Sequence, residues 1–292
     1  MKFNPLEHPI CLSYPNLIAE SAWMEHVPFA FFLISTVKPK VFVELGTWKG
    51  VSYCAFCQAI RSLNLDTKAY AVDSWLGDPH AGHLDDEDFL RLKQYHDPLY
   101  ASFSTLIRST FDEAVDHFAD GEIDLLHIDG FHSYEAVKHD FETWLPKMSH
   151  KGIILFHDTN ERKADFGVHK FWHEVSEKFP AFEFLHGHGL GLLAVGSQIP
   201  NEIEFIFQLK DNELATVRNF FKVLGERLES IKNMQELEKI ANDQQRLITE
   251  LRTYESTVKR SLLLRAYRSF KTEDFKTFSL KFVNFIKKKK NA

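Results

Sequence analysis

The chain has 292 residues, of which 44% are hydrophobic, enough for one full domain core and an appendage. The formal net charge of −6 argues against a nucleic-acid-binding protein. Its three cysteines form no disulfide-like framework, and no secretory signal or run of 18 apolar residues is evident, so we expect a cytoplasmic protein without a membrane-spanning helix.

Seven short apolar segments between residues 40 and 195 predict β-strands that alternate with helices. This alternation is typical of βαβ units and a mostly parallel sheet. The last two segments flank the glycine-rich turn His186–Gly189 and predict a terminal antiparallel hairpin. The sequence therefore predicts a Rossmann-like, doubly wound α/β fold, with strands at residues 41–45, 69–73, 103–107, 125–129, 152–157, 182–185 and 192–195.

The first predicted strand runs into a turn that carries Gly46 and Gly50. Ligands of open α/β sheets bind at the carboxyl ends of strands, where glycines let the backbone approach the ligand. The spacing lacks the three-glycine pattern that cradles a pyrophosphate, which disfavours a dinucleotide. Glu44, at the end of the strand, suits a cationic amino-acid group. These features favour S-adenosylmethionine, which carries an ammonium and a sulfonium.

Polar residues follow the next two predicted strands. Asp73 ends the second strand, where an acid accepts hydrogen bonds from ribose hydroxyls in nucleotide-binding folds. Its alternative role is a helix N-cap. Ser109 and Thr110 follow the third strand, where an adenine edge could be bound, but simple capping of the next helix explains them equally well. We expect Glu44 and Asp73 to flank one common ligand.

Two further strands end in Asp129 and Asp158, with His132 and His157 beside them. Because neighbouring strand ends converge, the two carboxylates repel each other unless they are protonated, separated or bridged by a cation such as Mg²⁺. A metal there would activate a substrate hydroxyl for attack on a methyl group. His132 is the candidate general base, since imidazole titrates near neutral pH, although a single histidine is more often structural.

Three other features complete this part of the chain. Residues 76–100 are too long for an ordinary connection and predict a lid over the substrate, with helical content. Cys54 and Cys57 fit two small buried side chains better than a redox or zinc pair. Three aromatic residues have the helical spacing of core packing rather than of a sugar-stacking platform. They are Trp144, Phe171 and Trp172.

Four of these segments resemble class I S-adenosylmethionine-dependent methyltransferases. They read ELGTWKGVS at residues 44–52, VDSW at 72–75, LHIDGFHSY at 126–134 and LFHDT at 155–159, and the likeness spans residues 40–197. The chain is similar to the group often found with glycan-synthesis proteins and glycosyltransferases, which is related to metal-dependent sugar and catechol O-methyltransferases. The resemblance implies O-methylation of a sugar hydroxyl on a surface polysaccharide or glycolipid. Alternatives are a non-catalytic nucleoside-binding scaffold of a glycan-synthesis complex and a hydroxylase-like relative.

The resemblance also implies roles for individual residues. Cofactor contacts would come from Glu44, Gly46, Trp48, Gly50, Ser52, Asp73, Ser109 and Asp129. Metal ligands would be Asp129, Asp158 and His157, with His132 as the catalytic residue. Two departures from the pattern bear on the metal, because Phe131 replaces an acidic residue and His157 replaces a second aspartate of some sugar-modifying relatives.

The chain changes character after Pro200. Apolar residues then recur every three or four positions, which predicts a helix over 201–260, either a coiled coil that joins copies of the chain or a helix docked on its own domain. Residues 258–292 hold eleven Lys and Arg against two acidic residues, a local charge of +9. A basic amphipathic tail over 261–292 can lie on anionic lipid, and a solvated terminus is the alternative. We thus expect residues 1–200 to form the catalytic domain.

Overall fold

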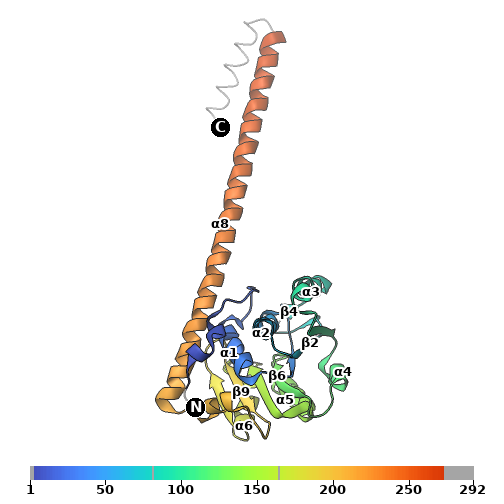
Figure 1. Ribbon diagram of the computed structural model, residues 1–292. Coiled ribbons are helices and arrows are strands. Elements are labelled where there is room, and N and C mark those ends of the chain that lie inside the picture. Colours follow the sequence, from blue (N-terminus) through green and yellow to red (C-terminus); the bar gives the residue numbers. More distant parts are fainter. Residues whose placement is uncertain (1–2, 81, 164, 273–292) are drawn as a thin grey trace. The chain divides into compact units, whose positions relative to one another are not determined.

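The computed structural model describes residues 3–80, 82–163 and 165–272, with side chains as far as residue 268 (Figure 1). The chain divides into two units, Met1–Lys232 and Asn233–Ala292. The first unit continues past the boundary expected at residue 200. The part of the predicted basic tail at residues 273–292 lies outside the described residues.

A seven-stranded sheet forms the centre of the first unit. Its strand order is β5-β2-β1-β6-β7-β9-β8, and β9 is antiparallel to both of its neighbours. Strands β1, β2 and β5 follow one another toward one edge of the sheet, and β6 and β7 toward the other, so the strand order switches between the parallel neighbours β1 and β6. Ligands bind at this switch point in doubly wound folds. The fold prediction, including the terminal hairpin, is confirmed. The strands are β1 (Val41–Leu45), β2 (Lys68–Asp73), β5 (Ser104–Arg108), β6 (Ile123–Ile128), β7 (Met148–His157), β8 (Ala181–Phe184) and β9 (Leu190–Ala194).

Helices cover both faces of this sheet (Figure 1). The α-helices among the described residues are α1 (Val27–Val37), α2 (Val51–Ser62), α3 (Asp86–Tyr100), α4 (Phe111–Ala114), α5 (Tyr134–Trp144), α6 (Val168–Ser176), α7 (Asn201–Glu204) and α8 (Asp211–Thr272). Short 3₁₀ helices occur at Pro5–Glu7, Pro9–Leu12, Met24–His26, Val115–His117, Leu145–Lys147 and Phe205–Gln208. The predicted lid consists of α3 and a small hairpin, β3 (Gly77–Asp78) with β4 (Gly82–His83).

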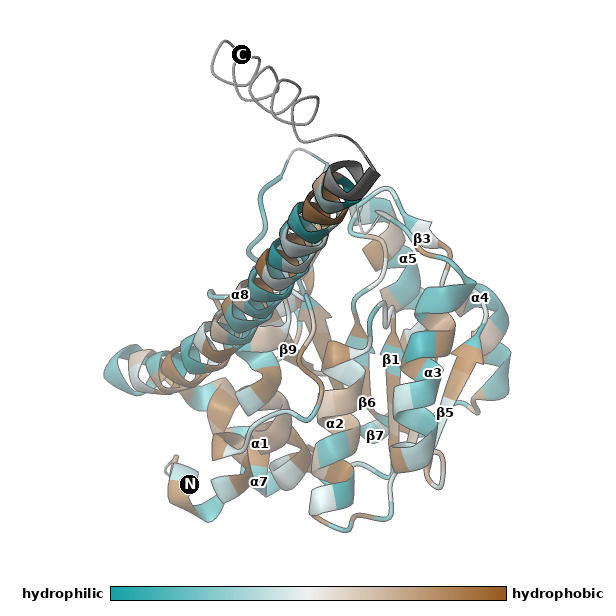
Figure 2. Cartoon of the chain, turned by 90° about the horizontal axis from the view of Figure 1, so that it is seen from above, coloured by the Kyte–Doolittle hydropathy of each residue, from teal (hydrophilic) through white to brown (hydrophobic). Residues whose placement is uncertain are grey.

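Alternating strand residues divide the core into two layers. Phe42 of β1 joins a cluster with α1, α2 and the start of α8, whereas Val41 and Val43 join a cluster with α5 and α6. Figure 2 shows the apolar colour of the central strands β1, β6 and β7. The core also takes up the predicted buried cysteines, Cys54 and Cys57, and the aromatic residues Trp144, Phe171 and Trp172.

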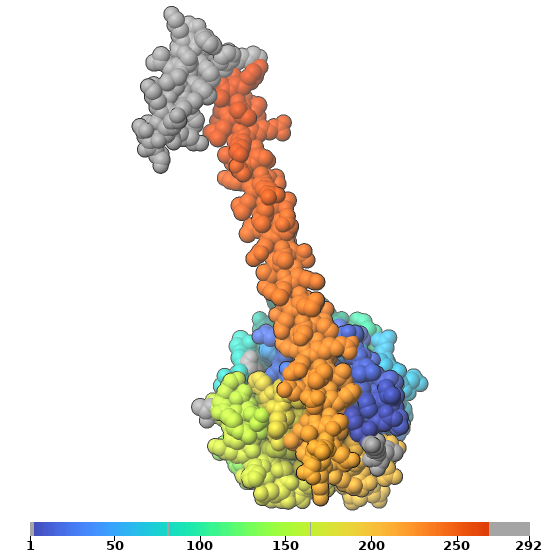
Figure 3. Space-filling model, turned by 90° about the vertical axis from the view of Figure 1, so that its left-hand side faces the viewer, coloured from blue at the N-terminus to red at the C-terminus, as the bar shows by residue number. Residues whose placement is uncertain are grey.

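The beginning of α8 belongs to this core. Val217, Phe221 and Leu228 are buried, and the Phe221 ring lies 5.2 Å from that of Phe29 in α1. A Cβ at Gly225 would collide with the backbone of Glu25, so the helix and the N-terminal segment are in close contact there. Figure 3 shows this part of α8 against the N-terminal residues, drawn in blue. For these turns, the docked-helix alternative holds.

The described part of the second unit, taken by itself, is the continuation of α8 from Asn233 to Thr272. Its apolar side chains are exposed, among them Leu237, Ile240, Leu247 and Leu251. Among the described residues, no helix is both long enough and apolar enough to cross a bilayer.

Candidate active site

A cavity of about 750 Å³ opens at the carboxyl ends of the central strands. Its walls are the turns after β1, β2, β5, β6 and β7, together with residues 20–23 of the N-terminal segment. All the predicted site residues except Glu44 line this cavity, namely Gly46, Trp48, Gly50, Ser52, Asp73, Ser109, Asp129, His132, His157 and Asp158.

The glycine turn after β1 forms one side of the cavity. Gly46 and Gly50 have φ angles of 85° and 80°, in the left-handed region that glycine adopts without steric cost. Trp48 between them has a φ of 46°, which is uncommon for a residue with a side chain. A Cβ on Gly46 would collide with the carbonyl oxygen of Asp129, so this glycine lets the ends of β1 and β6 approach each other.

The carboxylate of Asp73 holds this turn in place. Its Oδ2 accepts the backbone N–H groups of Thr47 and Trp48, at 2.8 and 2.9 Å, and its Oδ1 accepts that of Trp75 at 2.7 Å. These bonds explain how Trp48 is kept in a left-handed conformation. Asp73 therefore lines the cavity, as predicted, and its carboxylate fixes the glycine turn after β1. It is not the N-cap of a helix.

Ser109 also lies on the cavity wall. Its backbone N–H donates to the carbonyl oxygen of Asp73 at 3.0 Å, which joins the loops after β2 and β5. Its neighbour Thr110 is the N-cap of α4 and accepts the Glu113 backbone N–H at 3.3 Å. The capping role that the sequence allowed for this pair therefore belongs to Thr110.

The structure corrects the prediction for Glu44, which does not reach the cavity. Glu44 and His127 are register partners in β1 and β6, and both side chains are fully buried. Oε2 of Glu44 lies 2.8 Å from Nδ1 of His127, whose Nε2 accepts the indole N–H of Trp23 at 3.1 Å. Burial raises the pKa of Glu44. Successive side chains of a strand point to opposite faces of the sheet, and Glu44 lies on the same buried face as Phe42.

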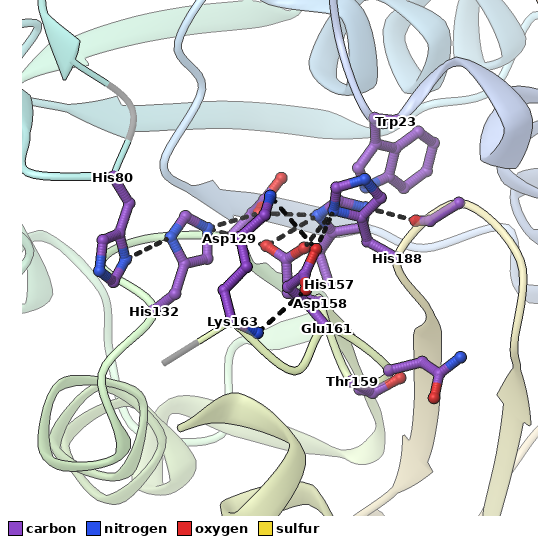
Figure 4. A network of polar contacts seen from close by, with 12 residues as sticks. Trp23, His80, Asp129, His132, His157, Asp158, Thr159, Glu161, Lys163 and His188 are labelled. Carbon is purple, nitrogen blue, oxygen red and sulfur yellow. Dashed lines mark hydrogen bonds and ion pairs between the residues drawn. The ribbon is translucent and has the colours of Figure 1, made fainter. Parts of the chain in front are cut away.

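The two predicted acids after β6 and β7 meet in a cluster with histidines (Figure 4). Nε2 of His132 lies 2.9 Å from Asp158 Oδ2 and 3.8 Å from Asp129 Oδ1. Nδ1 of His157 lies 3.2 Å from Asp129 Oδ1 and 3.3 Å from Asp158 Oδ2. His188, from the glycine-rich turn before β9, adds a contact of 3.3 Å to Asp158 Oδ1.

Opposite charges balance within this cluster. Burial alone would lower the pKa of His132, but its hydrogen bonds to Asp129 and Asp158 outweigh burial and raise that pKa to about 9. Burial is likewise outweighed at His157, where the two carboxylates raise the pKa well above its usual value. Burial would raise the pKa values of Asp129 and Asp158, but the histidines hold both below the usual range.

The same cluster contains a donor set for a cation. Asp129, His132 and Asp158 each offer one ligand atom, and these atoms lie within 4.8 Å of one another. Two carboxylates and an imidazole fit a divalent ion. The structure thus brings together the predicted Asp129 and Asp158 but supplies His132 as the third donor, while His157 contacts the same two carboxylates from its own side.

Several residues of the cavity wall were not predicted from the sequence, among them Trp23, His80 and His188. Trp23 precedes the first predicted strand, His80 lies in the segment predicted as a lid, and His188 lies in the glycine-rich turn, and no motif marks any of the three. Phe166 stacks on the His132 ring, with centroids 4.7 Å apart and planes at 8°. The Gly167 backbone N–H donates to the carbonyl oxygen of His132 at 2.7 Å, a local link that no sequence pattern signals.

Residues 43–159 match the model of a family described as a methyltransferase domain. An uncharacterised protein, y4gI, from Sinorhizobium fredii (strain NBRC 101917 / NGR234) is 45% identical over 189 residues, which cover 64% of this chain and 21% of that protein. The matched part of the chain thus spans about a fifth of the length of that relative.

Two solved structures are similar at lower identity. A putative caffeoyl-CoA O-methyltransferase from Staphylococcus aureus is 15% identical, with a TM-score of 0.47 and coverage of 62% of this chain and 86% of that one. A methyltransferase from Geobacter sulfurreducens is 15% identical, with a TM-score of 0.46 and coverage of 65% and 84%.

The family match covers the glycine turn, Asp73 and both acids of the cluster. The sheet that carries them has the doubly wound order with a terminal antiparallel hairpin. Residues 43–159 thus carry a methyltransferase domain, on a doubly wound sheet of the kind expected for a class I S-adenosylmethionine-dependent methyltransferase.

Proposed function

We propose that this chain transfers the methyl group of S-adenosylmethionine to a hydroxyl oxygen of an acceptor. The supporting observation is that one cavity holds both the glycine turn with Asp73 and the cluster of Asp129, His132 and Asp158. The first set is suited to a nucleoside and an amino-acid group, and the second to a hydroxyl that must lose a proton.

The reaction needs an in-line attack. The acceptor oxygen forms a bond to the methyl carbon while the carbon–sulfur bond breaks, which leaves S-adenosylhomocysteine, and the hydroxyl proton passes to a base. We assign the base role to His132, which lies on the cavity wall beside both carboxylates. A divalent cation held by Asp129 and Asp158 would polarise the hydroxyl and compete for the carboxylates that raise the pKa of His132.

The proposed acceptor is a sugar hydroxyl of a surface polysaccharide or glycolipid. Support comes from the motif resemblance to glycan-associated methyltransferases and from an exposed aromatic ring on the cavity wall. Phe131 is 36% exposed there, and an aromatic ring can pack against the C–H side of a sugar ring.

Calorimetric titration with S-adenosylhomocysteine tests the cofactor part of the proposal. We expect binding that Asp73→Ala weakens by more than tenfold, because the turn loses the acceptor of the Thr47 and Trp48 amides. Asp66→Ala is the matched control, since the Asp66 side chain is fully exposed and lies outside the cavity. A native protein that gives no binding heat would remove the proposal.

Transfer itself is tested by turnover. A panel of glycosides and phenols with labelled S-adenosylmethionine should show methylated glycosides with the native chain and none with His132→Asn. Full activity after chelation would eliminate an essential cation. Binding of S-adenosylhomocysteine without turnover on any acceptor would favour the scaffold alternative.

We also propose that the part of α8 after Lys232 joins copies of the chain. Its support is the set of exposed apolar residues at spacings of three, four and seven, Leu237, Ile240, Leu247, Leu251 and Tyr254.

A further inference from the structure

Two imidazole rings meet on the cavity wall, at the edge of His132 opposite the nitrogen that contacts Asp158. His80 belongs to the turn of the β3–β4 hairpin, and His132 follows β6. Their Nδ1 atoms lie 3.3 Å apart (Figure 4). The contact joins the hairpin to the loop that carries the proposed base.

The far nitrogen of each ring is already occupied. Nε2 of His80 lies 2.8 Å from Asp165 Oδ2, and Nε2 of His132 lies 2.9 Å from Asp158 Oδ2. An ionised carboxylate only accepts hydrogen bonds, so each Nε2 carries a hydrogen. A neutral imidazole has one N–H, and therefore two neutral rings would point the lone pairs of their Nδ1 atoms at each other. A positive charge between the nitrogens, a proton or a metal ion, removes this repulsion.

A third donor favours the metal ion. Asp78, His80 and His132 each offer one ligand atom, and all of these atoms lie within 4.8 Å of one another. The Asp78 carboxylate is held at the hairpin turn, because its Oδ1 accepts the His80 backbone N–H at 2.6 Å. Two nitrogens that are each 2.0–2.1 Å from a tetrahedral zinc ion lie about 3.3–3.4 Å apart, which agrees with the distance between the two rings.

The surroundings of the two rings also fit a metal site. Histidines that bind metals usually donate their other N–H to a carboxylate, and both rings do so here. Phe166 stacks on both rings, with centroids 4.5 Å from His80 and 4.7 Å from His132, and so restricts their rotation. Two imidazoles and one carboxylate form a donor set that Zn²⁺ prefers, whereas Mg²⁺ prefers oxygen ligands.

We propose that Asp78, His80 and His132 form a second cation site, of the Zn²⁺ type, which fastens the β3–β4 hairpin to the loop after β6. The site is separate from the carboxylate pair Asp129 and Asp158 and uses the opposite nitrogen of His132. With the ion bound, the hairpin closes one side of the cavity and both nitrogens of His132 are engaged, Nδ1 by the ion and Nε2 by Asp158. The ion therefore holds the ring in a resting state, and it has to leave Nδ1 before His132 can accept the hydroxyl proton.

Metal binding to the full chain tests this proposal without any assay of methyl transfer. Chelated and dialysed protein without an affinity tag is titrated with Zn²⁺ by calorimetry and with Co²⁺ by visible absorption. We expect the native chain to bind Co²⁺ with the intense visible bands of a tetrahedral site. His80→Asn and Asp78→Asn should each lose one equivalent of tightly bound ion. Asp165→Asn, which removes the charge beside His80, should weaken binding by about 10- to 100-fold.

His83→Asn is the matched control, because His83 lies in the same hairpin, is exposed and is outside the donor set. It should bind as the native chain does. Asp78→Asn keeps an oxygen that can accept the His80 N–H, so the turn is preserved in that variant. Circular dichroism confirms that each variant is folded, and X-ray absorption of the native zinc protein should show two imidazole ligands.

Equal ion stoichiometry and affinity in His80→Asn and His83→Asn would overturn the proposal. So would a native chain that binds no Zn²⁺, in which case a shared proton joins the two rings. Binding of S-adenosylhomocysteine, measured on the same variants, reports separately on the proposed function.

Discussion

At the residue scale, the Trp23–His127–Glu44 chain shows how neighbours set a protonation state. An indole N–H can only donate, so Nε2 of His127 accepts it and Nδ1 carries the hydrogen that is donated to Glu44. All three residues are buried and lie on segments far apart in the sequence. The Trp23 side chain thereby ties the N-terminal segment, which forms part of the cavity wall, to β6.

Trp23→Phe should therefore destabilise the fold mainly through a lost hydrogen bond. The phenyl ring keeps most of the packing, but Nε2 of His127 is left buried without its donor, at a cost of about 1–3 kcal/mol. Trp144→Phe is the matched control, because Trp144 is also fully buried and its Nε1 has no hydrogen-bond partner among the described residues. Urea unfolding measures both variants. An equal loss of unfolding free energy in the two would refute the role given to the Trp23 bond.

Asp140 makes the stability of the protein depend on pH. This carboxyl on α5 is only 7% exposed, and burial raises its pKa to about 7. Between about pH 4 and 7 the folded chain holds a proton that the unfolded chain has released. Refolding takes up that proton, so the free energy of unfolding falls as the pH rises through this range, by at most about 4 kcal/mol.

Asp140→Asn should remove this part of the pH dependence and leave the part due to His132 and His157, whose raised pKa values also lower the free energy of unfolding as the pH rises above about 6.5. The amide has no charge to bury, so the variant is expected to exceed the native chain in stability at about pH 8 and to approach it at about pH 4. Urea unfolding at both pH values measures the effect, with the exposed Asp66→Asn as a control. If the native chain and Asp140→Asn lose the same stability over this range, the buried carboxyl is not its cause.

At the element scale, patterns in the sequence predicted what depends on local order. All seven strands of the main sheet were predicted, because each is a short apolar run bounded by turn residues. Helix α1 was missed, since Val27–Val37 is buried on every side and has no polar face to reveal a helical period. The partner of Glu44 could not be predicted, because its contact with His127 depends on the register between β1 and β6.

Gly225 offers a test of how α8 docks. In an exposed helix, Gly→Ala stabilises by about 1 kcal/mol. At position 225 a Cβ would collide with the backbone of Glu25, which has no flexible end to move aside. We therefore expect Gly225→Ala to lower the melting temperature, whereas Asn219→Ala, at an exposed position of the same helix, should leave it equal or higher. A stabilised Gly225→Ala would show that the helix is not held against Glu25.

At the scale of the whole molecule, the division at Lys232 separates a part of α8 with buried apolar side chains from a part whose apolar side chains are exposed. Before it, the apolar spacing serves the core, and Phe221 touches the rings of Phe29, Phe32 and Phe184. After it, the same spacing continues with exposed side chains. In the sequence, the apolar spacing slips at Met234 and Leu237, close to this division, and then resumes. The slip alone does not show that the side chains before it are buried and those after it exposed, because burial depends on which surfaces are available in three dimensions.

Two truncated chains test this division. Residues 1–232 should unfold cooperatively and bind S-adenosylhomocysteine as the full chain does, because Val217, Phe221 and Leu228, the buried hydrophobic side chains of α8 up to residue 268, are retained. Residues 1–200 should fail to fold stably, since the loss of Ile203, Val217 and Phe221 exposes the aromatic cluster on α1. If the second unit joins copies, light scattering should give a larger species for the full chain and a monomer for residues 1–232. Equal subunit numbers for the two chains would leave the exposed apolar residues of α8 without a role in self-association.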